Sequence, residues 1–519
     1  MRAERLFSIL GLVDPELIDE ALDSNAAIRR RHAAVWSRYA AIAACCVIVC
    51  GALFWSVRFL GIGGGSDTAS TSESTAADTA DGADSGSAGG TGGDNAAQAP
   101  ADGYLSYAGP VLPLTAAETG TGLTAERTLT LDFAPEAHAD GTSGQWGAQV
   151  TDRYVLTNPT EADVTVTALY PVTGGLNDLA VMAPQLTVDG AAAEYVVYAG
   201  GYAGTFGDEN DRDGSTHNLA GPYSWEDYAA LVSDSDYLAG AMAGAPDLSA
   251  PVTVYDFSDV TLTGEAERPE LVVSCTFDPE ETTILSYDFS SSDWDDTGTW
   301  RQYGERIAPD RWGTPTLIVL GADIDYDLLA DYGTDAPAIT GADCAVVRRE
   351  TTLGEALAAL CRAELADREL TADVPLDQYE KAAAELLTEY GPLSDAPMDR
   401  YADGRLDDLL SEALTMDRIL YLAVPVTIQA GGSAEVTASF WKRPSYDFGG
   451  SGTGREGLQG FEVLTAAGSS LTFTDQSASV THTEGVEITE EDFGLDSGGT
   501  ALLDPAVPRY GLELRPIGK

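Results

Sequence analysis

Two stretches of the chain carry side chains that could hold a ligand or a metal ion. In the first, Asp208 to Gly214 (DENDRDG), oxygen-bearing side chains alternate ahead of a glycine, as they do in calcium-binding loops. Glu209, Asp211 and Asp213 are the candidate ligands. Ala220 stands where a closing carboxylate would be needed, so a solvated acidic loop is the competing interpretation. Calcium is the one cofactor that the sequence suggests.

The second stretch is rich in aromatic side chains and acids. It contains three of the eight tryptophans, and its candidate ligand-binding residues are Trp294, Trp300, Tyr303 and Trp312. Exposed aromatic rings stack on the apolar faces of sugars, while neighbouring carboxylates accept hydrogen bonds from hydroxyl groups. The pattern predicts a platform for a glycan or a peptide. The competing interpretation is that these rings fill a sandwich core beneath a loop.

Patterns typical of catalysis have little support, and we expect no enzyme. The four histidines, at positions 32, 138, 217 and 482, form neither an HExxH motif nor a cluster with cysteines, so zinc chemistry is not indicated. The glycine pattern from Gly452 to Gly457 lacks the strand and helix of a dinucleotide-binding unit. A glycosidase would need two acids held at a defined separation, which the sequence does not determine.

The elements that would position these residues begin with an apolar run, Tyr39 to Val57. Its 19 residues would span about 30 Å as a helix, the thickness of a bilayer's hydrocarbon layer. Arginines are concentrated before the run, which places residues 1–38 in the cytoplasm and the C-terminal part outside the cell. A cleaved secretory signal is the alternative, although its apolar core is normally shorter. We therefore expect a single transmembrane helix over residues 39–60.

A stretch without large apolar side chains follows. Residues 61–103 consist mainly of Gly, Ser, Thr, Ala and Asp, a composition that cannot bury a core. The composition predicts a disordered linker that tethers the outer part.

The segment before the membrane run predicts two short amphipathic helices. Their apolar positions are Leu6, Phe7, Leu10, Leu17, Ile18 and Leu22. Helices of this length are marginal alone, so these faces need a partner surface, unless the segment is a weakly ordered tail.

This arrangement also carries a family resemblance. LFSILGLVDPELIDEAL, a basic stretch and one membrane helix together resemble the N-terminal end of anti-sigma-factor-like and related uncharacterised single-pass proteins of Gram-positive bacteria. The stretch VPVTIQAGGSAEVTASFWKRPSYDF and the later PRYGLELR are similar to extracytoplasmic parts of such proteins. The resemblance implies that the six apolar residues contact a cytoplasmic sigma factor. A zinc-type anti-sigma motif is missing, because His32 is the segment's only histidine and no cysteine precedes the membrane run.

From residue 104 onward the pattern is mainly that of strands. Apolar residues alternate with polar ones, as at Val164, Val166, Ala168 and Tyr170, between turn signals such as Asp189-Gly190. We expect a mainly β chain with α insertions, made of Ig-like extracytoplasmic β-sandwich domains. The expected division is one sandwich over residues 104–345, with a short helical insertion, and a helical block with a second sandwich region over 346–519.

Helix start signals locate the α insertions. Three residue pairs have the spacing of a capping box, in which the first residue caps a helix that begins directly after it. These pairs are Ser224 with Asp227, Thr352 with Glu355, and Asp377 with Glu380. Helical spacing around Cys361 predicts that this cysteine is a core residue. Cys275, Cys344 and Cys361 are the three cysteines outside the membrane run. Either two of them form one disulfide and the third is a spare thiol, or all three are reduced.

The charge of the chain narrows the function. The 83 acidic and 28 basic residues give a formal net charge of −55, which disfavours binding to nucleic acid. We expect a single-pass membrane protein with its N-terminus in the cytoplasm, whose extracellular part binds or senses a glycan or protein and whose inner helices couple to a sigma factor. The alternatives are a cell-surface adhesin or envelope structural protein and, less favoured, a carbohydrate-binding or carbohydrate-active protein.

Overall fold

The computed structural model describes most of the chain after residue 105. The described ranges are 106–134, 147–203, 225–262, 270–295, 297–306, 314–329, 342–398, 400–448, 455 and 457–517. They lie in the second of two compact units, Asp94–Lys519, whereas the first unit, Met1–Gly93, lies outside them. The predicted cytoplasmic helices and transmembrane helix lie in the first unit, and the predicted linker (61–103) extends beyond it, but all three fall outside the described residues. None of the helices in the described ranges combines the length and apolarity needed to cross a bilayer.

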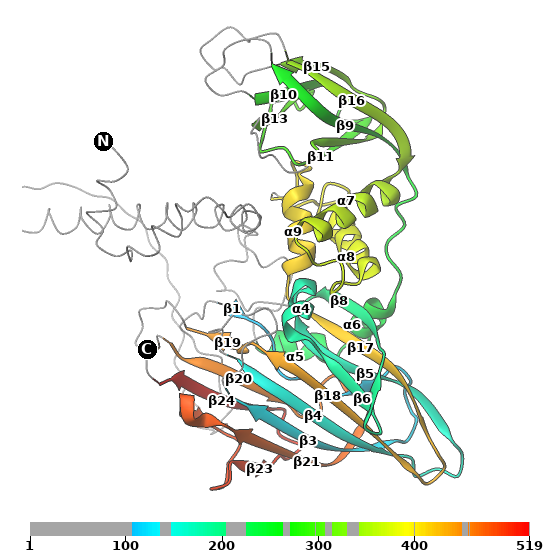
Figure 1. The fold of residues 1–519 in the computed structure, drawn as a ribbon. Coiled ribbons are helices and arrows are strands. Elements are labelled where there is room, and N and C mark those ends of the chain that lie inside the picture. Colours follow the sequence, from blue (N-terminus) through cyan, green and yellow to red (C-terminus); the bar gives the residue numbers. More distant parts are fainter. Residues whose placement is uncertain are drawn as a thin grey trace, which may run out of the picture. The chain divides into compact units, whose positions relative to one another are not determined.

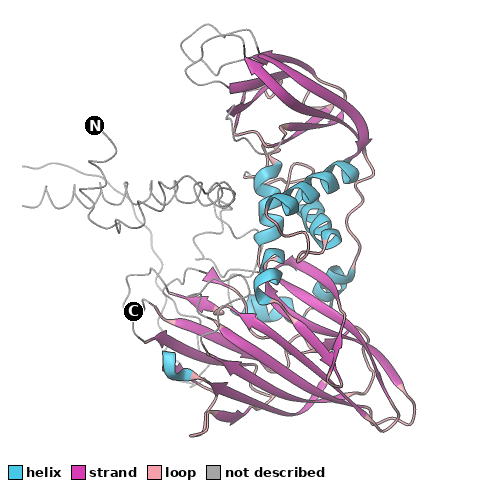
Figure 2. Cartoon of the chain, viewed as in Figure 1, coloured by secondary structure: helices cyan, strands magenta, loops and turns pink. Residues whose placement is uncertain are grey.

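The described part is mainly β, with several sheets and few helices, which confirms the expected mainly β chain (Figure 2). Three sheets form what we call the base. The seven-stranded sheet consists, in order, of β23 (Thr500–Leu502), β21 (Thr472–Thr481), β3 (Thr124–Asp132), β4 (Ala148–Thr157), β18 (Ser433–Lys442), β6 (Gln185–Val188) and β7 (Ala191–Ala193). The four-stranded sheet consists of β2 (Thr115–Ala116), β5 (Val164–Gly174), β17 (Arg418–Ile428) and β8 (Val196–Tyr202). The five-stranded sheet consists of β1 (Ser106–Tyr107), β19 (Tyr446–Asp447), β20 (Gln459–Leu464), β24 (Arg509–Pro516) and β22 (Val486–Glu491).

The base strands show the alternation that the sequence predicts. In β4, Val150, Tyr154 and Leu156 are buried while intervening residues are more exposed, so one face of the strand meets the core. The base also has short helices. These are η1 (Leu176–Asp178), α4 (Leu179–Met182), α5 (Trp225–Ser233), α6 (Ser235–Met242) and η3 (Thr483–Gly485). Helix α5 begins at Trp225, and the predicted cap Ser224 lies outside the described residues.

The strands of the base are interrupted in the sequence by a separate β-sandwich. Strands β8 and β17 pair directly, although more than two hundred residues separate them along the chain. Between them come α5 and α6, then β9 to β16, and then three further helices, α7 to α9 (Figure 1). The domain boundary expected after residue 345 therefore differs from the structure, because it falls inside β16 (Ala342–Thr352). Strands on the two sides of this boundary also belong to the same sheets, since β4 pairs with β18 and β5 pairs with β17. Alternation shows that a strand has a buried face but not which distant strand it pairs with.

We call β9 to β16 the inserted sandwich. Its inner sheet is β11 (Thr282–Tyr287), β14 (Thr316–Gly321), β9 (Pro251–Leu262) and β16 (Ala342–Thr352), in that order. Its outer sheet is β12 (Ser291–Trp294), β13 (Trp300–Arg306), β10 (Glu270–Thr276) and β15 (Asp325–Leu329). Phe257, Val273, Cys275, Tyr303 and Leu317 pack between the two sheets as a separate core.

The other face of the inner sheet packs on the helices. Val254, Leu285 and Ile318 join the core cluster that contains the buried faces of α7 (Leu353–Asp367), α8 (Leu376–Glu389) and α9 (Leu406–Thr415). The sheet is therefore covered on both sides, which explains why its strands carry consecutive apolar residues.

Helix caps agree with the sequence at one position and differ at another. Thr352 caps α7, and its hydroxyl oxygen accepts a 3.2 Å hydrogen bond from the Glu355 backbone N–H, as predicted. The cap predicted at Asp377 is wrong, because α8 begins at Leu376 and its N-cap is Pro375, two residues before Asp377, with no side-chain cap. Cys361 is buried in α7 as expected, and no disulfide involves the three cysteines of the described part.

Helix α8 also closes the open edge of β8. The Gln378 side-chain oxygen accepts a 2.9 Å hydrogen bond from the Ala199 N–H, and Lys381 Nζ donates to the Ala199 carbonyl at 3.2 Å. Lys381 donates two further bonds of 2.7 Å to the Gly240 and Ala241 carbonyls at the end of α6. These contacts satisfy the backbone groups of Ala199 on the open edge of β8, and they fix the helices against the base.

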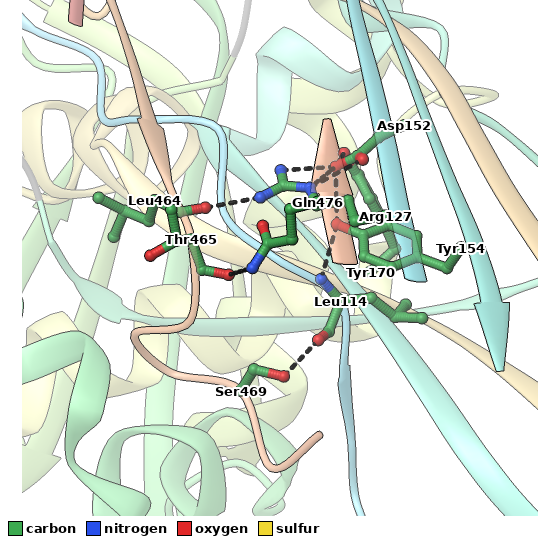
Figure 3. A network of polar contacts seen from close by, with 9 residues as sticks. All are labelled: Leu114, Arg127, Asp152, Tyr154, Tyr170, Leu464, Thr465, Ser469 and Gln476. Carbon is green, nitrogen blue, oxygen red and sulfur yellow. Dashed lines mark hydrogen bonds and ion pairs between the residues drawn. The ribbon is translucent and has the colours of Figure 1, made fainter. Parts of the chain in front are cut away.

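A buried polar network lies inside the base (Figure 3). Arg127 on β3 and Asp152 on β4 form an ion pair of 2.8 Å whose side chains are both 0% exposed. The Asp152 carboxylate also accepts hydrogen bonds from the hydroxyls of Tyr154, at 2.7 Å, and Tyr170, at 3.1 Å. Arg127 donates to the Leu464 carbonyl at 2.6 Å, so every charged group of the network has partners.

Candidate functional site

The outer sheet of the inserted sandwich presents one face to its own core and the other away from it. On β10, Val273 and Cys275 point into the core, so Ser274 and Thr276 point to the opposite side. Tyr303 on β13 points into the core in the same way, which places Trp300 and Gln302 on that opposite side. We call this side the outer face.

Strand register places polar side chains of the outer face in rows. One row runs across all four strands: Asp293, Gln302, Ser274 and Asp327. A neighbouring row contains Trp300, Thr276 and Asp325. Adjacent strands are about 4.8 Å apart and alternate residues of one strand about 7 Å apart, so the two rows cover a patch about 14 Å long.

Trp300 is fixed in orientation within this patch. Its indole Nε1–H donates a 2.9 Å hydrogen bond to the Ser274 hydroxyl oxygen on the neighbouring strand. The Ser274 side chain is short, so this bond holds the indole nitrogen close to the sheet surface. The indole is therefore tied to the sheet surface at its nitrogen, and Trp300 as a whole is only partly buried.

The turn before Trp300 is held by Asp295. Its carboxylate accepts hydrogen bonds from the Thr297 hydroxyl at 2.6 Å, the Thr299 hydroxyl at 3.1 Å and the Trp300 backbone N–H at 3.2 Å. These bonds, that of Thr297 foremost, lower the pKa of Asp295 because they favour the carboxylate. Asp295 therefore orders the β12–β13 hairpin that carries Trp300.

The structure separates the aromatic residues predicted to form one platform. Trp294 pairs with Arg301, whose partner on β10 is Cys275, so it lies on the side opposite Trp300. Its side chain is 53% exposed at the sheet edge. Tyr303 is fully buried and packs against Phe289 at a ring distance of 5.5 Å. Trp312 lies outside the described residues.

Trp300 is therefore the predicted aromatic residue that meets polar neighbours on an open face. The sequence prediction missed its polar neighbours on β10 and β15, which are Ser274, Thr276, Asp325 and Asp327. The alternation of polar with apolar residues in both strands was a signal that they have one open face, but their position beside Trp300 depends on strand pairing.

The outer face offers several kinds of side chain that can contact a ligand. The two rows offer a ring face, hydroxyls, an amide and three carboxylates, and they contain no Lys, Arg or His. Asp325 and Asp327 lie side by side on one strand, whereas a glycosidase needs two carboxyl groups that flank the bond to be cleaved. Among the residues that the structure describes, no group of three or more His, Cys, Asp or Glu could hold a metal ion.

The remaining predicted sites fall outside the described ranges. They are the calcium candidates Glu209, Asp211 and Asp213 and the six apolar residues from Leu6 to Leu22. Comparisons with known proteins add no assignment, since the chain matches no family model, no curated protein and no solved structure.

Proposed function

We propose that this chain is a membrane-anchored extracytoplasmic binding or sensing protein, and that the outer face of the inserted sandwich binds a neutral glycan. The observation that carries the proposal is the partly buried Trp300 ring, tied to the sheet surface by Ser274 and bordered by hydrogen-bonding side chains in register.

The ligand class follows from the two kinds of contact that the patch offers. The apolar C–H face of a sugar ring stacks on an indole, and its hydroxyls donate to carboxylates and to the Gln302 side-chain oxygen. Asp293, Asp325 and Asp327 repel anionic polymers, which favours an uncharged glycan over a phosphorylated or sulfated one. The patch, about 14 Å long, matches a short stretch of such a chain.

The inserted sandwich also supports the Ig-like interpretation in part, because it pairs two four-stranded antiparallel sheets around one core. The membrane anchor at Tyr39–Val57 and the coupling of the inner helices to a sigma factor rest on the sequence pattern and on the family resemblance. Together these features describe a receptor with a ligand surface outside the cell.

Glycan binding is tested with the full-length protein in detergent micelles and a soluble neutral glucan, using calorimetry. Trp300→Ala removes the stacking surface and should weaken binding about tenfold or more. Trp294→Ala is the matched control, since it removes an exposed tryptophan from the same hairpin on the opposite face and should leave affinity unchanged.

Ser274→Ala should weaken binding less than Trp300→Ala, because it loosens the ring without removing it. A wild-type protein that binds no neutral glycan, or equal losses in the two tryptophan variants, would contradict the proposal. Stronger binding to an anionic polysaccharide would contradict the charge argument.

Coupling to a sigma factor is tested separately by co-precipitation. Leu17→Asp with Leu22→Asp should abolish recovery of a cytoplasmic partner, while Glu16→Gln with Glu20→Gln on the polar face should not. Unchanged recovery in the leucine variant, combined with retained glycan binding, would support the adhesin alternative instead.

A further inference from the structure

A pocket of about 480 Å³ lies in the described part, where the helices meet the base. Three segments line it: α4 with the turn that follows, the start of β8, and the connection between α7 and α8 together with the first turn of α8. The volume falls within the range of small-molecule sites, about 300–1,000 Å³. It is independent of the outer face of the inserted sandwich, with which it shares no residue.

We infer that this pocket binds a small organic cation, a primary amine carried on an apolar body. The apolar walls come first. Leu179 and Pro375 line the pocket with Val196, a residue that is 56% exposed. Val197 turns into the base core, whereas its neighbour Val196 presents a β-branched side chain to the hollow. An apolar ligand body would cover this surface and remove it from water.

The polar groups of the pocket favour a donor or a cation. Tyr195 donates its hydroxyl hydrogen to the Pro184 carbonyl at 3.0 Å, which leaves the hydroxyl oxygen free to accept. Asp373 and Asp377 add two carboxylates, and no Lys, Arg or His is among the lining residues. Asp377 accepts one bond, from the Gln378 side-chain amide at 2.9 Å, and so retains further acceptor capacity.

The N-terminus of α8 at Leu376 opposes this charge only in part. A helix end contributes about half a positive charge, and the two carboxylates contribute two negative ones. The local balance is negative, so a carboxylate or phosphate ligand is disfavoured and an ammonium group is favoured.

The pocket walls are also held in place before a ligand arrives. The bonds from Gln378 and Lys381 to Ala199 fix α8 against β8, a few residues from the lining residues of both elements. A preformed site loses little free energy to ordering when it binds. The ligand would contact the base and the helices at once and stabilise their junction.

The test uses 2-phenylethylamine with the full-length protein in detergent micelles, measured by calorimetry. The neutral 2-phenylethanol and the anionic 3-phenylpropanoate have similar apolar bodies and serve as ligand controls. We expect the amine to bind at least tenfold more tightly than either, with affinity that falls as salt rises. Equal binding of the alcohol would overturn the inference.

Two variants assign the binding to this pocket. Asp373→Asn with Asp377→Asn removes both exposed carboxylates and should weaken amine binding at least tenfold. Glu280→Gln with Glu281→Gln, in the exposed turn between β10 and β11, is the matched control and should leave it unchanged. Val196→Lys should abolish binding, because its own ammonium group would occupy the site. Amine binding that survives both pocket variants would place the amine elsewhere and overturn the inference, whereas Trp300→Ala should not affect it.

Discussion

The base and the inserted sandwich solve the same packing problem in different ways. Both bury apolar faces between sheets, but the base encloses the Arg127–Asp152 ion pair, whose side chains are 0% exposed. In the described part of the inserted sandwich, the Arg348–Asp323 pair lies at the surface, with side chains 44% and 45% exposed. The base therefore depends on a satisfied polar network, and the inserted sandwich on an apolar core.

The two regions also differ in the sequence separation of their strands. In the inserted sandwich, β10 pairs with β13 and β11 with β14, all within one continuous stretch. In the base, β3 pairs in parallel with β21, about 350 residues away. Strands that are far apart in the sequence lose more loop-closure entropy when they pair than strands that are close together. The base therefore needs interactions that select the correct strand partners. The polar network supplies such an interaction, since Arg127 on β3 donates a hydrogen bond to the Leu464 carbonyl at the end of β20.

The largest expected effect comes from breaking the ion pair of the base. Asp152→Ala leaves the Arg127 guanidinium buried without its counter-charge and should reduce the free energy of unfolding by about 3–5 kcal/mol. Burial is the largest single influence and opposes the charged form of Arg127, but Asp152 together with Tyr154 and Tyr170 outweighs it and raises the pKa of Arg127.

The control for this prediction is the adjacent residue. Arg153→Ala breaks an ion pair with Glu435 whose side chains are 45% and 35% exposed, and should cost less than about 1 kcal/mol. Urea unfolding measures both variants. Amide exchange should show protection lost in β3 and β4 and kept in β10 and β13. Equal losses in the two variants would erase the proposed difference between the regions.

A second prediction concerns the joint where β11 meets α9. Asp407 Oδ1 accepts a 2.9 Å bond from the Asp288 N–H, while its buried Oδ2 has no hydrogen-bond partner. Burial raises the pKa of Asp407 to about 7, with the hydrogen bond from the Asp288 N–H and then Arg405 partly opposing this. The folded state thus favours the protonated form of Asp407. The contribution of this group to the free energy of unfolding is therefore fully present below about pH 4 and is lost as the pH rises towards 7.

Asp407→Asn keeps the acceptor for Asp288 and removes the charge. The variant should match the wild type near pH 4 and exceed its free energy of unfolding by at most about 4 kcal/mol at pH 8. Asp408→Asn, at the exposed neighbouring position, should change neither value. Urea unfolding across this pH range gives the answer, and parallel pH profiles for Asp407→Asn and wild type would refute the assignment.

The smallest predicted effect compares two buried tyrosines. The Tyr154 hydroxyl donates to Asp152 at 2.7 Å and accepts from the Leu114 N–H at 3.0 Å. The Tyr303 hydroxyl makes no hydrogen bond of acceptable geometry, although burial raises its pKa to about 12 and nearby Arg301 partly offsets this. Tyr154→Phe should cost about 1–3 kcal/mol, and Tyr303→Phe less than about 0.5 kcal/mol, in urea unfolding. Equal costs would show that the two cores rely on polar contacts alike.

The sequence by itself determined the local features of the fold. Period-two alternation predicted the strands of the base, and the Thr352–Glu355 pair predicted the start of α7, because both patterns depend on neighbours only a few residues away. The helix cap predicted at Asp377 was wrong by two residues, since Pro375 precedes α8 without a side-chain cap. Local signals thus predict that elements exist better than where they begin.

Only the tertiary structure decided which elements meet. The pairing of β8 with β17, the ion pair between Arg127 and Asp152, and the row of polar groups beside Trp300 join segments whose partners no local pattern specifies. The separation of Trp294 from Trp300 onto opposite faces likewise depends on the register of one hairpin. A strand's own residues determine that one face is buried, whereas register and partner depend on the free energy of the whole assembled core.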